Sequence, residues 1–266
     1  MAVVAHVREA IAAARTARFE LGLGLDQPVH DLLEVVEEAA GVPVAVLALP
    51  EGVAGAYLVR RDQPFIFLNG GEWITRQRLT LAHELGHHRI HHRAVLDGIE
   101  NVEGKSKDPL EQQAFAFAGE FLSPEQALRG WLEARGDPLI DITVLSRMGV
   151  AFGISAPAMF VRLVDAGILQ RAKQRQALKR QLDRGQHRAV EKALDLNPVE
   201  DQLARIKREN AVPRLPAKLR DNALGAYAAG LIDLDRLALA LRRDRDTVER
   251  LVTQLGLTPQ EPEPDW

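Results

Sequence analysis

The sequence contains no cysteine among its 266 residues. This absence excludes disulfide bonds, thiol nucleophiles, iron–sulfur clusters and zinc sites with thiolate ligands. Any metal ion must therefore be held by His, Asp or Glu. Aromatic residues are also scarce, at 5% of the chain. None is interleaved among the clustered basic residues, so we expect no stacking on single-stranded bases.

Long apolar runs are missing as well. No segment approaches about 18 consecutive uncharged apolar residues, the length that predicts a transmembrane helix. Charged side chains interrupt the first 21 residues, which therefore lack the apolar core of a signal peptide. From these absences we predict a cytoplasmic protein with no membrane partner.

The chain has no strong excess of charge of either sign, since 34 Lys and Arg residues face 37 Asp and Glu residues. This balance hides a division of charge along the chain. Residues 171–221 hold 14 basic and seven acidic residues, a net charge of +7, which leaves −10 for the rest. We predict a basic helical connector here, which is either a solvated helix or a surface for DNA or an acidic partner.

The spacing of apolar residues predicts an α+β fold, in which a small antiparallel sheet is followed by an all-α region. Helices are expected at residues 3–20, 31–40, 75–90, 109–122 and 124–135, three strands at 44–49, 55–60 and 64–68, and a mobile surface loop at 93–108.

Beyond residue 135 the patterns are helical, and two segments resemble one another. Each predicts a helix, a short turn with a Ser or Asp cap, and a second helix, which is the helix-turn-helix pattern. Helix pairs of this size are also common packing units, so the pattern alone does not assign DNA contact. The predicted units are a first domain over 1–135, a helix-turn-helix-like unit over 136–170, the connector over 171–221, a second such unit over 222–258 and a disordered tail over 259–266.

The motif HExxH occurs on the predicted helix at residues 75–90, as His83-Glu84-Leu85-Gly86-His87. Four residues make slightly more than one turn, so both imidazoles lie on one face and can chelate one ion. Glu84 is rotated by about 100° from His83 and can reach a water at that ion. We therefore predict a catalytic Zn²⁺ site, with Mn²⁺ as the alternative ion and Glu84 as general base. The competing interpretation is a solvated, histidine-rich helix end.

A third ligand is expected from the helix predicted at residues 109–122. Glu111 is favoured, because it lies on the face that can pack against the HExxH helix, where a carboxylate is costly to bury unless it coordinates. Glu120 falls on the opposite side and is predicted to face solvent. Glu100 and Glu103, in the expected loop, are weaker candidates, and Asp108 is a candidate for orienting an imidazole.

Two further side chains are candidates for a supporting role. Tyr57 could stabilise the oxyanion of a tetrahedral intermediate, although a strand tyrosine that packs at a sheet edge is the favoured interpretation. His91 follows His87 by four residues and could supply an oxyanion donor or contact a ligand.

The HELGH helix with its following His91, and the later segment EQQAFAFAGEFLSP at residues 111–124, resemble the ImmA/IrrE family of metallopeptidases. Its members pair HELGH with a helix of the form E-x-x-A-x-x-F-A-x-x-L-L-x-P. The resemblance covers about residues 30–170. It implies a zincin-like domain in which His83, His87 and Glu111 are the zinc ligands and Glu84 is the base.

The resemblance further implies a site-specific bacterial endopeptidase that cleaves a helix-turn-helix transcriptional repressor. Cleavage would derepress genes in a stress response or on a mobile element, and the repressor would be the protein substrate. One alternative is a non-catalytic DNA- or protein-binding regulator on a zincin-like scaffold. Another is an antitoxin-like partner that binds its repressor without cutting it. The intact Glu84 favours the enzyme.

Overall fold

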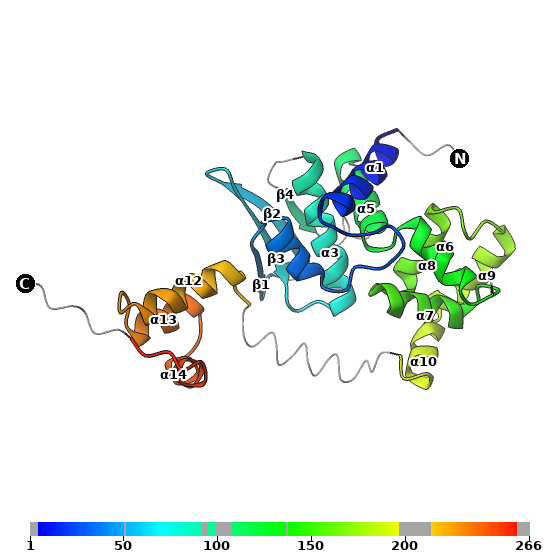
Figure 1. The fold of residues 1–266 in the computed structure, drawn as a ribbon. Helices are drawn as coiled ribbons and strands as arrows, with labels where there is room; N and C mark the ends of the chain where they lie inside the picture. Colours follow the sequence, from blue (N-terminus) through cyan, green and yellow to red (C-terminus); the bar gives the residue numbers. More distant parts are fainter. Residues whose placement is uncertain are drawn as a thin grey trace, which may run out of the picture.

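The structure is a computed structural model that describes residues 5–50, 52–91, 95–98, 108–136, 138–196 and 214–259. It confirms the α+β class, with one small sheet and a majority of helices (Figure 1). The elements are α1 (Ala5–Glu20), α2 (Leu32–Glu34), the π-helix η1 (Val35–Ala39), β1 (Val44–Leu47), β2 (Val53–Arg60), β3 (Gln63–Asn69), α3 (Ile74–Gly86), the π-helix η2 (His87–His91), β4 (Val95–Gly98), α5 (Pro109–Leu122), α6 (Glu125–Glu133), α7 (Ile142–Phe152), α8 (Ala156–Asp165), α9 (Ala172–Asp183), α10 (Gln186–Ala193), α12 (Ala217–Ala228), α13 (Leu234–Leu241) and α14 (Arg245–Gln254).

The sheet is mixed rather than purely antiparallel, with strand order β1-β3-β2-β4. Strands β2 and β3 form an antiparallel hairpin. Its two turn residues, Arg61 and Asp62, both have positive φ, as the tight turn of a twisted hairpin requires. The expectation of three antiparallel strands is wrong for β1, which pairs with β3 in parallel. Both edges of β2 are occupied, by β3 and β4, so β1 pairs with the open edge of β3.

Strand β4 corrects a second expectation. Residues 93–108 were expected to form a surface loop, but residues 95–98 pair antiparallel with β2. Residues 93–94 and 99–107 of that loop, including Glu100 and Glu103, lie outside the described residues.

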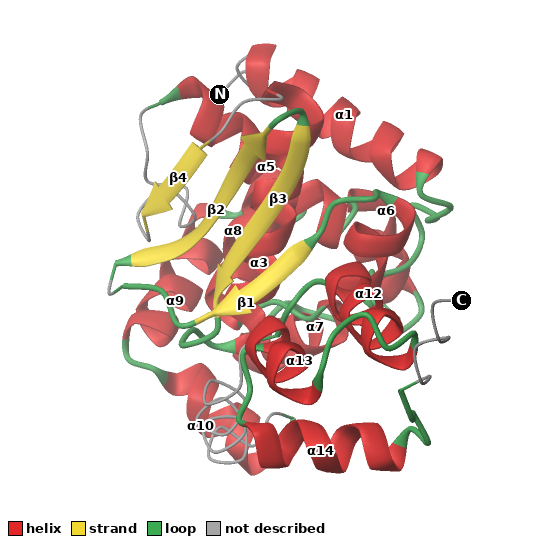
Figure 2. Ribbon diagram, turned by 90° about the vertical axis from the view of Figure 1, so that its left-hand side faces the viewer, coloured by secondary structure: helices red, strands yellow, loops and turns green. Residues whose placement is uncertain are grey.

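Helices cover one face of the sheet. Figure 2 shows α1, α3 and α5 behind the four strands, and their apolar sides meet the sheet in one buried cluster that contains Ile66, Leu85, Phe117 and Phe121. Residues of α7, α8 and α9 belong to the same cluster. Helices α7 to α9 are therefore built into the main core.

Helices α12 to α14 gather around a separate hydrophobic cluster that includes Tyr227, Leu237 and Val248. Just before α12, Arg214 forms an isolated antiparallel bridge with Val46 on the outer edge of β1. This places the three helices beyond β1, away from α6 to α10 (Figure 1). The expected basic connector is described only in part, since residues 197–213 lie outside the described residues, as do residues 260–266 of the expected tail.

The two helix-turn-helix patterns have the caps that the sequence predicts. Ser155 caps α8, and Gly153 ends α7 with a φ of +66°. Asp244 caps α14 in the same way. The axes of α7 and α8 are bent by 95°, which is the geometry of a helix-turn-helix pair. Within the described residues, no single helix is long and apolar enough to cross a membrane, and only the bent pair α7 and α8 together passes that test.

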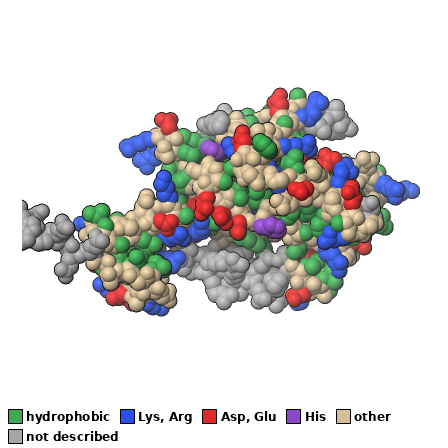
Figure 3. Space-filling model, in the orientation of Figure 1, with side chains coloured by type: hydrophobic (Ala, Val, Ile, Leu, Met, Phe, Trp, Pro, Cys, Tyr) green, Lys and Arg blue, Asp and Glu red, His purple; other side chains and the backbone are tan. Residues whose placement is uncertain are grey.

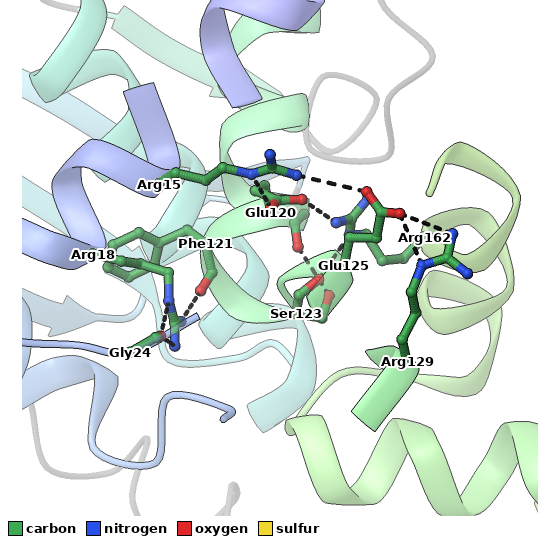
Figure 4. Close-up of polar contacts among 10 residues, drawn as sticks. Arg15, Arg18, Gly24, Glu120, Phe121, Ser123, Glu125, Arg129 and Arg162 are labelled. Carbon is green, nitrogen blue, oxygen red and sulfur yellow. Dashed lines mark hydrogen bonds and ion pairs between the residues drawn. The ribbon is translucent and has the colours of Figure 1, made fainter. Parts of the chain in front are cut away.

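Glu120 is not a solvent-facing residue, as its helical position suggested. Only 2% of its surface is exposed. Its carboxylate accepts a hydrogen bond from Arg15 Nε of α1 at 2.7 Å and pairs with the Arg162 guanidinium of α8 (Figure 4). Burial lowers the pKa of Arg162, while the nearby Glu120 carboxylate raises it. The prediction failed because α5 is packed on two sides, so a charged side chain on its second side also needs a partner.

Candidate metal centre

Helix α3 and the π-helix η2 carry the HExxH motif through a continuous helical stretch. His83 and His87 lie one turn apart on the same face, and both are fully buried. Gly86 lies between them, where an added Cβ would come within 3.2 Å of the Ala114 Cα atom on α5. The absence of a side chain at Gly86 therefore lets the two helices approach closely.

Glu111 comes from the first turn of α5. Asp108 caps this helix by accepting a hydrogen bond from the Leu110 N–H at 2.9 Å, and Pro109 occupies the first helical position. The cap and the proline fix where α5 begins, and they place Glu111 against α3 with 6% of its surface exposed. Asp108 thus has a structural role at the helix terminus.

Three ligand atoms converge at this point. The Nε2 atoms of His83 and His87 are 3.1 Å apart. Glu111 Oε2 lies 3.3 Å from His83 Nε2, and its Oε1 lies 3.5 Å from His87 Nε2. Within the described part of the chain, His83, His87 and Glu111 form a group whose ligand atoms are close enough to hold one metal ion.

The spacing of the ligand atoms is compatible with a tetrahedral site. With metal–ligand bonds of about 2.0–2.1 Å, two ligand atoms of a tetrahedron are about 3.3 Å apart. The two Nε2 atoms are 3.1 Å apart, and each lies 3.3 or 3.5 Å from a different carboxylate oxygen of Glu111, so all three distances are close to this value. Two imidazoles and one carboxylate also leave a fourth position open, which is the donor set of catalytic zinc sites. The residues present therefore fit such an ion.

Glu84 is fully buried beside this triad, and strand β2 approaches it closely. A Cβ added to Gly55 of β2 would lie 2.8 Å from Glu84 Oε1 and 2.5 Å from Thr80 Cγ2. Both distances are shorter than real Cβ contacts, so a side chain at this position of the strand would displace its neighbours. The carboxylate of Glu84 is thus held between α3 and the backbone of β2.

His91 contacts the Nδ1 atom of His87, the ring nitrogen that does not face the triad. Its Nδ1 lies 2.9 Å from His87 Nδ1, and its Nε2 lies 3.1 Å from Gln113 Oε1. If His87 binds an ion through Nε2, its Nδ1–H donates to His91 Nδ1, and the Nε2–H of His91 then donates to Gln113. This chain would fix the tautomer and the ring orientation of His87. The sequence suggested His91 but not Gln113, whose position two residues after Glu111 gives no signal of its own.

Tyr57 has a different partner. It is buried on β2, and its hydroxyl lies 2.9 Å from His88 Nδ1. Burial raises the pKa of this phenol. The described contacts join Tyr57 to His88 rather than to the triad. The expectation of a tyrosine at a sheet edge is wrong in its position, because β2 is paired with β3 on one side and with β4 on the other.

Comparison with known proteins agrees with this geometry. The sequence profile of the IrrE N-terminal-like domain matches residues 37–163, which include β1 to β3, the triad and the pair α7 and α8. The matched domain belongs to the ImmA/IrrE family. Metallopeptidase ImmA of Bacillus subtilis (strain 168) is 37% identical over 67 residues, which cover 25% of this chain and 38% of the relative. The match thus spans less than half of either protein, and α12 to α14 lie outside the family domain.

Proposed function

We propose that this protein, with its ImmA/IrrE-family domain, is a zinc-dependent endopeptidase. The convergence of His83, His87 and Glu111 at one place, with ligand atoms close enough to hold one ion, carries the proposal. A bound zinc ion supplies a Lewis acid, which polarises a peptide carbonyl and lowers the pKa of water toward about 7. Mn²⁺ has compatible ligand chemistry and is the alternative ion.

In this proposal the protein's own groups position the ion and move the proton. His91 and Gln113 keep the His87 ring oriented toward the ion. Glu84 accepts a proton from the attacking water on its carboxylate and donates it to the amine nitrogen that leaves. Its confinement against Gly55 keeps the carboxylate in one place, which proton transfer in the transition state requires.

We further propose that the substrate is a helix-turn-helix repressor in the bacterial cytoplasm, whose cleavage derepresses stress or mobile-element genes. The ImmA/IrrE motifs support this substrate. Helices α12 to α14 would hold the repressor. On α14 the exposed Arg245 is paired with Asp235 and Glu249, which reduces the positive charge that phosphates require. Large apolar side chains, Leu231 and Leu239 among them, are also exposed on this unit, and Figure 3 shows hydrophobic side chains on its surface. We therefore propose a protein as its partner, with DNA as the alternative.

The test uses the full chain and its Glu84→Gln variant. Each is analysed for bound metal and then incubated with the helix-turn-helix repressor encoded beside its gene, and fragments are identified by mass spectrometry. We expect both proteins to hold one zinc ion and only the wild type to cut. Cleavage by Glu84→Gln at the wild-type rate would refute the assigned base. A stable complex without fragments would favour the non-catalytic regulator.

A further inference from the structure

A groove with a volume of about 670 Å³ lies between the metal-binding helices and the helical region that follows them. Its lining comes from the start of α3, from α5 and from α7 to α10. The apolar lining residues that matter here are Trp73, Leu79, Phe115, Val150, Pro157 and Val161.

Large apolar side chains remain partly exposed in this groove. Trp73, Val150 and Val161 keep 39%, 37% and 39% of their surface accessible, although they come from three different elements. Apolar side chains that are gathered at one concave place, with charged residues at the rim, are typical of binding sites. Lys179 and Asp183 at the rim pair with each other. We therefore expect apolar contacts to determine which side chains the groove binds.

The exposed side of α8 is unsuited to DNA. The second helix of a DNA-binding helix-turn-helix presents polar and basic side chains to the bases and phosphates. On α8 the exposed residues are Pro157, Val161 and Asp165, and its arginine, Arg162, is buried against Glu120. Pro157 and Val161 instead line the groove.

The groove begins one helical turn from the triad on both helices that supply ligands. Leu79 precedes His83 by four residues on α3, and Phe115 follows Glu111 by four residues on α5. One turn is about 5.4 Å, and an extended peptide advances about 3.3 Å per residue. A substrate side chain about two residues from the cleaved bond can therefore reach the groove.

We infer that this groove binds the substrate segment beside the cleaved bond and selects bulky aliphatic or aromatic side chains there. The inference rests on the proposed function, since it gives that same site its substrate preference. Its occupant is a polypeptide with apolar side chains, because the groove lining begins one helical turn from His83 on α3 and from Glu111 on α5. Its volume falls within the range of about 300–1,000 Å³ found for sites that enclose small ligands, which leaves room for more than one such side chain.

The experiment measures binding and cleavage separately. The full-length Glu84→Gln variant is immobilised with zinc and exposed to a synthetic library of decapeptides randomised at every position. Bound peptides are sequenced by mass spectrometry. The same library is incubated in solution with the wild-type chain, and the residues that flank each cut are recorded.

Val161→Lys places a charge in the groove, and it is made both in the wild-type chain and in the Glu84→Gln variant. Val150→Lys repeats the test from α7, in case the first variant folds poorly. Val59→Lys is the matched control, because Val59 is 36% exposed on β2 and lies outside the groove. Zinc content and thermal unfolding confirm that each variant is folded.

We expect Leu, Ile, Phe and Met to be enriched in the bound peptides and at one position beside the cuts. Val161→Lys and Val150→Lys should lower this enrichment by roughly tenfold or more, the scale on which an apolar pocket discriminates, and Val59→Lys should leave it unchanged. Equal enrichment in all variants, or no apolar enrichment in wild type, would overturn the inference. Groove-dependent binding without any cutting would support the groove and refute the proposed peptidase.

Discussion

Gly55→Ala tests whether β2 confines the carboxylate of Glu84. The new Cβ would meet Glu84 Oε1 at 2.8 Å and Thr80 Cγ2 at 2.5 Å, whereas ordinary contacts of a Cβ begin at 3.4 Å. The Phe67 carbonyl oxygen of β3 lies 3.0 Å from the new Cβ, so the Cβ cannot relieve these contacts by moving toward that oxygen. Thr80 is fully buried, and its β-branched side chain is stiff about χ1. The strand and Glu84 must therefore share the displacement, and Oε1 of Glu84 needs about 0.6 Å, the difference between 3.4 and 2.8 Å, to regain an ordinary contact distance.

Such a shift is large for a group that transfers a proton. A misplacement of about 1 Å can cost about 100-fold in rate. We therefore expect kcat/KM to fall roughly 10- to 100-fold, which is about 1.4–2.7 kcal/mol of transition-state stabilisation. The added methyl group should also cost about 1–3 kcal/mol of stability through overpacking. Zinc content should not change, because the atoms that crowd the new Cβ belong to none of the three ligands.

The assay follows cleavage of the identified substrate at saturating zinc, together with metal analysis and a urea unfolding curve. Gly130→Ala is the control, because an added Cβ there meets nothing within 4 Å on α6. This variant should cleave as wild type does. If Gly55→Ala were also to cleave at the wild-type rate with full zinc, then β2 would not confine Glu84, and the argument from close approach would fail.

Three further outcomes follow from the same contacts. His91→Ala removes the contact that orients His87 and should weaken zinc binding about 10- to 100-fold, as measured by chelator competition. The control His30→Ala, at an exposed histidine, should leave the zinc affinity unchanged. Glu120→Gln leaves the buried Arg162 without its carboxylate and should lower the free energy of unfolding by about 3–5 kcal/mol; an unchanged urea midpoint would contradict the buried ion pair. Zinc at 100 times its Kd should stabilise the wild type by about 2.7 kcal/mol, and a chelator should abolish that difference in thermal unfolding, whereas an identical unfolding temperature with and without zinc would refute binding to the folded state.

Periodicity and capping were sufficient to predict the helices that build the site. The expected range for α5, residues 109–122, agrees with the structure, because Asp108-Pro109 gives a strong start signal and Ser123-Pro124 a strong stop signal. The spacing of His83 and His87 predicted a shared face without knowledge of the fold. Glu111 followed from the cost of burying a carboxylate on a packed face.

Strand pairing could not be predicted in the same way. The short β-branched apolar run of β1 indicates a strand but not which edge it joins. Its parallel pairing with β3 is possible because β3 has one open edge, whereas β2 is paired on both sides. Gln113 was also beyond sequence reasoning, because its contact with His91 depends on how η2 lies against α5.

Glu120 shows how tertiary packing changes the meaning of a helical pattern. A helix that lies on a core buries one face, and a carboxylate on the opposite face normally meets water. Helix α5 instead packs against α3 on the side of Glu111 and meets α1 and α8 on the side of Glu120. The same helix therefore holds one carboxylate for a metal ion and pairs the other with two arginines. Because α8 also lines the groove, the Glu120–Arg162 pair ties the groove wall to the helix that carries Glu111.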